Sequence, residues 1–346
     1  MIKEAMQKLI CRRSLSFTES VECMRLMLGG EMTEAQIGAF LAALAAKGEE
    51  RDEVLGFLHS LREKMVQVEV MEDVVDTCGT GGDMIGSFNA STAAALIASA
   101  AGVKVAKCGN RSSSSHCGSA DLLEAVGVRI ELTDREVGVW LKESNFAFLY
   151  TPTFHPALRS LASLRRELGF RTVFNLLGPL GNPVCPARHL LGVSSRELAP
   201  LYAEILLGLG AKHSMVVHGL DGMDEISMTA PTEVYEIRNG KITYSLFEPK
   251  SLGLSNWSHE DIRGGSIDEN RTLLFDLLEG KPGAICDITC VNAGAALLLS
   301  GQANCLSEGY LMAKNIIDSG TARAKLDELI KRSNQTTEGE MVHVHA

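Results

Sequence analysis

The fold is decided by the stretch Asp76-Thr-Cys-Gly-Thr-Gly-Gly-Asp83, which is followed by Asn89-Ala-Ser-Thr92 and by an apolar run over 93–101. The two valines before it indicate the end of a buried strand. The glycines allow a tight turn whose backbone N–H groups gather on one side, as in phosphate-binding nests. The apolar run predicts a helix capped by Asn89 or Ser91, and its N-terminus would add partial positive charge at the same turn.

A second polar turn follows one strand later. Val103–Ala106 predicts a strand, and it leads into Lys107-Cys-Gly-Asn-Arg111 and Gly118-Ser-Ala-Asp121. The Lys107 ammonium can balance phosphate charge, and neutral hydrogen bonds are offered by Asn110, Ser115 and Ser119. A single glycine-rich turn is usually only a tight connection, and this one matches neither the dinucleotide nor the Walker pattern. Two such turns, one βα unit apart, indicate a site for a multiply phosphorylated anion.

The bulk composition is that of an ordinary globular protein. The chain has 346 residues, 45% hydrophobic and 22% charged, which is long enough for two domains. A formal charge of −10 argues against a nucleic-acid surface. No apolar run approaches the roughly 18 residues of a membrane span, and the N-terminus lacks a signal-peptide layout. Nine scattered cysteines suit reduced thiols, so we expect a cytoplasmic protein without membrane or nucleic-acid partners.

The N-terminal part predicts helices alone. Capping-box patterns begin at Ser16 and Thr33, and helical spacing of apolar residues follows. We therefore expect a small helical domain over 1–65, with the 157–183 segment as a candidate to complete it, and an α/β catalytic domain over 66–346. The apolar stripes of the helical domain could also form a homodimer interface.

From residue 74 onward, strands and helices alternate, which predicts a mostly parallel central sheet flanked by helices. The expected strands are Val103–Ala106, Val128–Ile130, Ala147–Tyr150, Met215–His218 and Ala284–Ile288. The expected helices are Ala120–Val126, Arg135–Glu143, Glu197–Leu209 and Arg271–Leu278. Ligands of such sheets bind beyond the carboxyl ends of the strands, so the loops after Val75, Ala106, Tyr150 and His218 should converge on one cleft.

Some residues that suggest metal binding have simpler explanations. Cys286 and Cys290 lie in an apolar run with no second ligand pair nearby, so we expect them to pack in the core. The polar tail from about Arg332 is expected to fray, which makes His343 and His345 incidental.

Two further segments carry charge suited to a site. A helix expected over Ala157–Leu168 ends in Arg165-Arg-Glu-Leu-Gly169, and a guanidinium there could clamp a planar carboxylate. Gly219-Leu-Asp-Gly-Met-Asp-Glu-Ile-Ser227 places adjacent carboxylates after a strand, where they are costly unless a cation lies between them. Mg²⁺ favours such oxygen ligands together with substrate phosphate. An exposed acidic turn is the competing explanation.

These motifs together resemble the anthranilate phosphoribosyltransferases, over most of the chain. Members of that family read Gly-Thr-Gly-Gly-Asp, Lys-His-Gly-Asn-Arg, Ser-Gly-Ser-Ala-Asp, Arg-Arg-x-Leu-Gly-x-Arg-Thr and Asp-Gly-x-Asp-Glu. The resemblance implies transfer of 5-phosphoribose from phosphoribosyl pyrophosphate (PRPP) to the amine of anthranilate, in tryptophan biosynthesis, by a cytoplasmic homodimer. The aryl amine is neutral at pH 7, so no general base is assigned.

The resemblance also implies a role for each site residue. The PRPP-binding residues would be Gly79, Thr80, Gly82, Asp83, Ser87, Asn89, Ser91, Thr92, Lys107 and Ser119. The anthranilate-binding residues would be Gly79, Asn110, His155, Arg165 and Gly178. Mg²⁺, with two ions expected, would be held by Ser91, Asp224 and Glu225.

The chain departs from the family pattern at four positions. Cys108 replaces a histidine that borders the acceptor site, His116 and Cys117 stand where many members have Lys and Ser, and Gly181 replaces a threonine. Two alternatives stay open: a nucleoside phosphorylase, which needs no Asp-Glu metal pair, and a non-enzymatic relative that binds nucleic acid.

Overall fold

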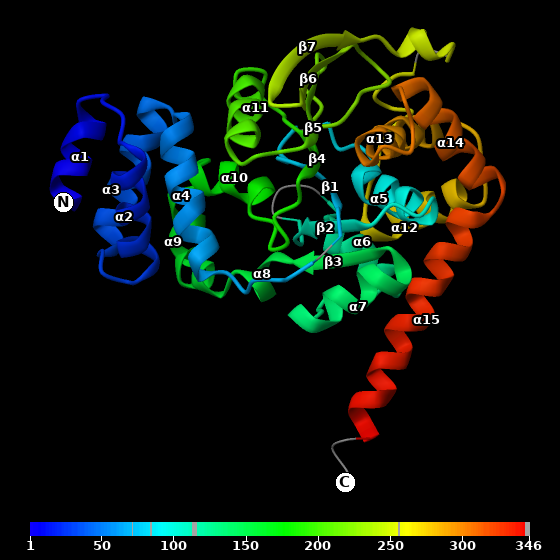
Figure 1. Cartoon of the computed structure of the whole chain (residues 1–346), viewed down its shortest axis with the longest axis horizontal. Helices are drawn as coiled ribbons and strands as arrows, with labels where there is room; N and C mark the ends of the chain where they lie inside the picture. The colour runs from blue at the N-terminus through cyan, green and yellow to red at the C-terminus, as the bar shows by residue number, and fades with distance from the viewer. Residues whose placement is uncertain (71, 84, 113–115, 255–256, 343–346) are drawn as a thin grey trace.

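The computed structural model describes residues 1–70, 72–83, 85–112, 116–254 and 257–342, and it places a helical bundle beside a larger α/β domain (Figure 1). The predicted fold class is therefore confirmed. The bundle lies at one end of the long axis, with the sheet in the middle and a layer of helices on its far side (Figure 1).

The bundle is built from amphipathic helices with well-formed ends. Its helices are α1 (Ile2–Ile10), α2 (Phe17–Leu28), α3 (Glu34–Lys47) and α4 (Arg51–Lys64). Both predicted capping boxes, at Ser16 and Thr33, are formed. Helices α2 and α4 cross at Gly56, where a Cβ would lie 2.5 Å from the Phe17 carbonyl oxygen, so only glycine permits this close approach.

The sheet has seven strands in the order β3-β2-β1-β4-β5-β6-β7. They are β1 (Val75–Gly79), β2 (Val105–Gly109), β3 (Phe146–Tyr150), β4 (Arg188–Gly192), β5 (His213–Gly219), β6 (Thr232–Arg238) and β7 (Lys241–Phe247). The first five are parallel, and β6 and β7 add an antiparallel edge. The carboxyl ends of β1, β2, β3, β4 and β5 therefore meet along one edge, where ligands of such sheets bind.

The long helices of the larger domain cover the sheet. They are α5 (Ala90–Ala100), α6 (Ser119–Ala125), α7 (Asp134–Ser144), α11 (Leu198–Gly208), α12 (Ile267–Leu278), α13 (Ala284–Ser300), α14 (Leu306–Asp318) and α15 (Thr321–Val342). The shorter elements are α8 (Thr151–Phe154), η1 (Pro156–Leu161), α9 (Ala162–Leu168), α10 (Val173–Leu177), η2 (Gly178–Leu180) and η3 (Pro249–Leu252).

The sheet separates two hydrophobic cores. Met215 and Val217 of β5 face a core shared with α5, α13 and α14. Val216, which points the other way, joins a second core that runs through α10 and α11 into the bundle. This alternation is the period of two expected for strands buried on both faces. The bundle and the sheet are thus joined through one continuous apolar layer.

Three sequence-based predictions of secondary structure are wrong. Ala284–Ile288 is not a strand but the first part of α13, a 17-residue helix buried on nearly all sides. A short apolar run cannot by itself distinguish a buried strand from a buried helix. Residues 128–130 are not a strand either, although Val128 and Ile130 are buried. Strand β1 begins at Val75, where we expected it to end.

The C-terminal prediction also fails in part. Helix α15 continues to Val342, so the chain does not fray at Arg332. Arg332 pairs with Glu143 at 2.5 Å, which ties the helix to α7. Ser115, His343 and His345 lie outside the described residues. Cys286 and Cys290 are buried in α13, as expected.

Candidate active site

Four of the five parallel strands end in glycine, at the edge where the loops converge: Gly79, Gly109, Gly192 and Gly219. A Cβ at Gly79 or Gly192 would overlap atoms of Asp224, and one at Gly109 would overlap the Ser119 hydroxyl. The loops therefore lie directly on the strand ends, and a side chain at these positions would push them away.

The acidic loop after β5 reaches the first glycine-rich turn. The Gly81 amide donates to Asp224 Oδ2 at 2.6 Å, and the Ser91 amide donates to Glu225 Oε1 at 2.9 Å. Ser91 lies in the first turn of α5, so the free donors of that helix face the carboxylates. Two segments separated by more than 130 residues thus form one polar cluster, which we call the carboxylate pocket (Asp83, Ser91, Lys107, Asp224 and Glu225).

Burial and mutual repulsion disfavour charge on these acids. Burial, followed by the charge of Asp83, raises the pKa of Asp224 to about 6. Burial and the neighbouring Asp224 raise the pKa of Glu225 well above its usual value, and burial also raises the pKa of Asp83. Glu225 Oε2 is buried and has no hydrogen-bond partner among the described residues. Buried acids with raised pKa values suit a divalent cation. Its positive charge would stabilise the ionised carboxylates, and it would give Glu225 Oε2 a partner.

Lys107, on strand β2, is the cation of the carboxylate pocket. Its side chain is only 2% exposed, and its ammonium donates to the Thr77 carbonyl and, at 3.3 Å, to Ser91 Oγ. Its ammonium therefore lies on the α5 side of the sheet, next to Ser91.

The other predicted donor residues lie around the first turn. Thr80 Oγ1 accepts from the Ser194 amide at 3.1 Å, and Asn89 occupies the N-cap position of α5 without a side-chain cap bond. Gly82 adopts a positive φ, and the Ser87 backbone bridges to Arg263. Thr92 is fully buried, and its hydroxyl has no hydrogen-bond partner among the described residues.

Two residues at this turn were missed by the sequence analysis. Arg171 donates to the Gly81 carbonyl at 3.2 Å, and Ser194 Oγ donates to the same oxygen at 3.0 Å. Arg171 was part of a quoted motif, but only the fold shows that it contacts the glycine turn. Ser194 follows β4, a strand that we had not predicted.

The second turn is held by an ion pair. Arg111 bonds Glu124 at 2.7 Å and Asp121 at 3.3 Å, so its guanidinium is occupied within the loop. Asp121 also accepts from the Gly118 amide at 3.0 Å. Ser119 begins α6, and its hydroxyl donates to the Asn110 carbonyl.

A cavity of about 230 Å³ opens beside the carboxylate pocket, and we call it the acceptor cavity. All five predicted anthranilate residues line it: Gly79, Asn110, His155, Arg165 and Gly178. Two of the family departures, Cys108 and Gly181, line it as well. The sequence therefore identified a set of residues that the fold brings together from five separate segments.

Arg165 and His155 give the acceptor cavity its polar character. The Arg165 guanidinium lies 5.1 Å from the centre of the Phe174 ring, and no ion pair holds it among the described residues. Burial lowers its pKa, as expected for a cation without a counter-ion. His155 Nε2 donates to the Gly181 carbonyl at 2.6 Å, and its buried Nδ1 has no partner in the described part of the chain.

No helix within the described ranges is long and apolar enough to cross a membrane.

Comparison with protein families divides the chain in two. Residues 3–65 match the helical bundle domain of a glycosyl transferase family, and residues 71–323 match the α/β domain of that family. The anthranilate phosphoribosyltransferase of Thermomicrobium roseum is 45% identical over 346 residues, covering 99% of both chains. That of Alkaliphilus metalliredigens is 43% identical over 97% of this chain and 99% of its own.

Solved structures with a similar fold belong to the same family of enzymes. The anthranilate phosphoribosyltransferase of Thermus thermophilus superposes with a TM-score of 0.89 at 39% identity, covering 95% of this chain and 99% of its own. The Saccharomyces cerevisiae enzyme in complex with PRPP and Mg gives 0.88 at 28% identity, covering 96% and 98%. The chain therefore belongs to the anthranilate phosphoribosyltransferase family.

Proposed function

We propose that this chain transfers the 5-phosphoribosyl group of PRPP to the amine of anthranilate, releasing pyrophosphate, as a step of tryptophan biosynthesis. One observation carries the proposal: Gly79 borders both compartments. It lines the acceptor cavity with Arg165, and it lies against Asp224 of the carboxylate pocket. A donor in the carboxylate pocket would thus present its anomeric carbon to an acceptor in the cavity.

The donor site that we propose combines the two glycine-rich turns. Backbone amides of the first turn and of the α5 N-terminus would bind the diphosphate, and Lys107 would balance its charge. The residues proposed for PRPP are Gly79, Thr80, Gly82, Asp83, Ser87, Asn89, Ser91, Thr92, Lys107 and Ser119.

We propose Ser91, Asp224 and Glu225 as the magnesium ligands, with two ions. The unpartnered Glu225 Oε2 and the raised pKa of Asp224 support this assignment. Bound Mg²⁺ would neutralise the pyrophosphate leaving group.

The acceptor site would bind anthranilate through its carboxylate. Arg165 has no counter-ion among the described residues, so a carboxylate ligand would complete it. Asn110, His155, Gly178 and Gly79 would surround the ring. The neutral aryl amine needs no base, so the residues act by aligning it with the anomeric carbon and by stabilising the departing charge.

Family membership favours this function over a nucleoside phosphorylase or a nucleic-acid-binding relative. The net charge of −10 also disfavours the second alternative.

The assembly and the domain division are also proposals. We propose a cytoplasmic homodimer formed through the helical domain, with the domain boundary between residues 65 and 66 and with 157–183 completing the helical part. Exposed apolar side chains support the interface, since Ile10 is 64% and Phe17 43% exposed.

Anthranilate fluorescence tests the function directly. We expect the signal to fall with turnover only when the protein, PRPP and Mg²⁺ are all present. An unchanged signal, or phosphorolysis of a nucleoside without Mg²⁺, would contradict the proposal.

A further inference from the structure

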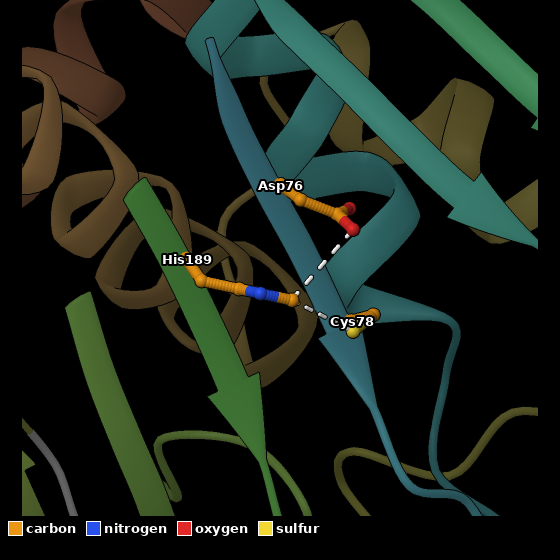
Figure 2. Close-up of side chains that lie close together, drawn as sticks. All are labelled: Asp76, Cys78 and His189. Carbon is orange, nitrogen blue, oxygen red and sulfur yellow. Dashed lines mark hydrogen bonds and ion pairs between the residues drawn. The ribbon is translucent and has the colours of Figure 1, made fainter. Parts of the chain in front are cut away.

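A buried polar cluster lies on the sheet between two cavities. Asp76 and Cys78 project from β1, and His189 projects toward them from neighbouring β4 (Figure 2). Cys78 Sγ lies 3.1 Å from His189 Nε2, and that nitrogen lies 3.6 Å from Asp76 Oδ2. One ligand atom from each residue falls within 4.8 Å of the others.

We propose that Asp76, Cys78 and His189 form a zinc-binding site. Zinc bonds thiolate, imidazole and carboxylate at about 2.0–2.3 Å, so ligand atoms around a tetrahedral ion are separated by about 3.3–3.8 Å. The separations from His189 Nε2, 3.1 Å to Cys78 Sγ and 3.6 Å to Asp76 Oδ2, are close to this range, and the third pair lies within 4.8 Å. Three protein ligands leave a fourth position for water, as in open zinc sites.

Within the described residues, no lysine or arginine side chain bonds directly to Asp76. Asp76 is fully buried and accepts hydrogen bonds from the Asn182 side chain at 2.8 Å and from the Cys108 amide at 3.3 Å. Both donors are neutral. His189 is its only recorded ion-pair partner among the described residues, and burial lowers the pKa of this imidazole, which keeps it neutral. Lys107 and Arg62 act on His189 through their charge alone, so the cluster has no directly bonded cation among the described residues.

Zinc would supply a directly bonded cation. Binding of Zn²⁺ releases one proton from the Cys78 thiol, and the resulting thiolate, the Asp76 carboxylate and the ion sum to zero charge around a neutral His189. Thiolate and imidazole ligands favour zinc over magnesium, whereas the carboxylate pocket offers only oxygen. The two metals are thus directed to different sites.

The site borders two cavities. Cys78 lines the acceptor cavity, and His189 lines a second cavity of about 80 Å³ together with Arg62. Zinc bound to Cys78 would lie at the wall of the acceptor cavity and hinder the acceptor. This consequence rests on the proposed function, but the site itself does not.

Cobalt titration of the full, reduced chain tests the site. Co²⁺ is a spectroscopic substitute for Zn²⁺ in tetrahedral sites, and we expect one equivalent to give a thiolate-to-cobalt charge-transfer band that Zn²⁺ abolishes. Cys78→Ser should remove the band, and Asp76→Asn should weaken cobalt binding at least about tenfold. An oxygen-only magnesium site cannot produce this band.

The matched control is Cys290→Ser. Cys286 and Cys290 form the competing thiol pair, with their sulfur atoms 3.9 Å apart. The band should survive Cys290→Ser, and a band that is lost there but persists in Cys78→Ser would overturn the proposal, as would the absence of any band. Anomalous diffraction from zinc-soaked wild-type crystals needs no variant: a peak between the three side chains supports the site, and a peak only elsewhere refutes it.

Discussion

Glycine at the carboxyl end of β4 is required by its neighbour. A Cβ at Gly192 would overlap the backbone of Asp224, so Gly192→Ala should displace the acidic loop and lower kcat/KM by at least about a hundredfold, the scale of misplaced catalytic groups. Steady-state kinetics would measure this loss. The control is Gly138→Ala in α7, where an added Cβ would have no atom of the surrounding structure within 4 Å, and its kinetics should match the wild type.

Asp224 makes the metal-free protein sensitive to pH. Its pKa is raised from 3.8 to about 6, so the ionised form costs stability above pH 6, and this cost disappears as pH falls from 6 toward 4. Asp224→Asn should therefore raise the Tm of the metal-free protein at pH 8 by about 2–4 °C, a value reduced for partial exposure. The gain should shrink near pH 4.5.

Magnesium should act in the opposite direction on the same pair of proteins. Thermal shift with added Mg²⁺ at pH 8 should stabilise the wild type more than Asp224→Asn, because the ion binds the carboxylate. An equal rise in Tm in both proteins would show that the ion binds at another site.

Cys108 tests how far the acceptor cavity tolerates the family departure. Its Sγ lies 3.7 Å from Thr151 Oγ1, and burial raises the pKa of the thiol to about 12, so it stays uncharged. Cys108→His should preserve or tighten anthranilate use, measured as kcat/KM. A tenfold loss would show that the cavity is built for another acceptor.

At the scale of elements, α13 and α14 cross through a pair of glycines. A Cβ at Gly294 would lie 2.5 Å from the Tyr310 amide nitrogen and 2.6 Å from the Gly309 carbonyl carbon. Gly294→Ala should destabilise the protein by about 1–3 kcal/mol, the usual cost of overpacking. Thermal melts would show a lower Tm, whereas Gly138→Ala, in an open helix position, should raise it.

Sequence alone predicted some elements better than others, for physical reasons. The amphipathic helix α3 was found because its apolar periodicity and its capping box agree. Helix α13 was mistaken for a strand because burial on nearly all sides removes the periodic signal. Strands β4, β6 and β7 were missed. Because β4 was missed, Ser194 and His189, the neighbour of Asp76 and Cys78, were missed as well.

Several residues of the candidate site stood out in the sequence because their signals are local. Glycine turns, Lys107 and the Asp224–Glu225 pair carry local signals, and the structure brings them together. Arg171 could not be placed, because its role depends on a contact with Gly81 across 90 residues. Whether these groups bind the proposed substrates stays a prediction.

At the scale of the whole molecule, the exposed apolar side chains predict how copies associate. We expect a dimer in light scattering after gel filtration, and the double variant Ile10→Lys, Phe17→Lys should shift it toward monomer by placing charge in the interface. Leu311→Lys is the control, because Leu311 is 60% exposed on α14, away from the bundle. A dimer lost only in Leu311→Lys would relocate the interface.

The apolar layer that joins the bundle to α10 couples the position of the bundle to the shape of the acceptor cavity. Phe174 and Asn175 of α10 line the acceptor cavity, and α10 packs into the same core as α3 and α4. Tilting of the bundle would thus be transmitted to the wall around the ring-binding space, while Asp224 and Glu225 stay fixed to the strand ends. The enzyme should accordingly accept substituted rings more readily than altered sugar donors, because the acceptor cavity can change shape with the bundle and the carboxylate pocket cannot.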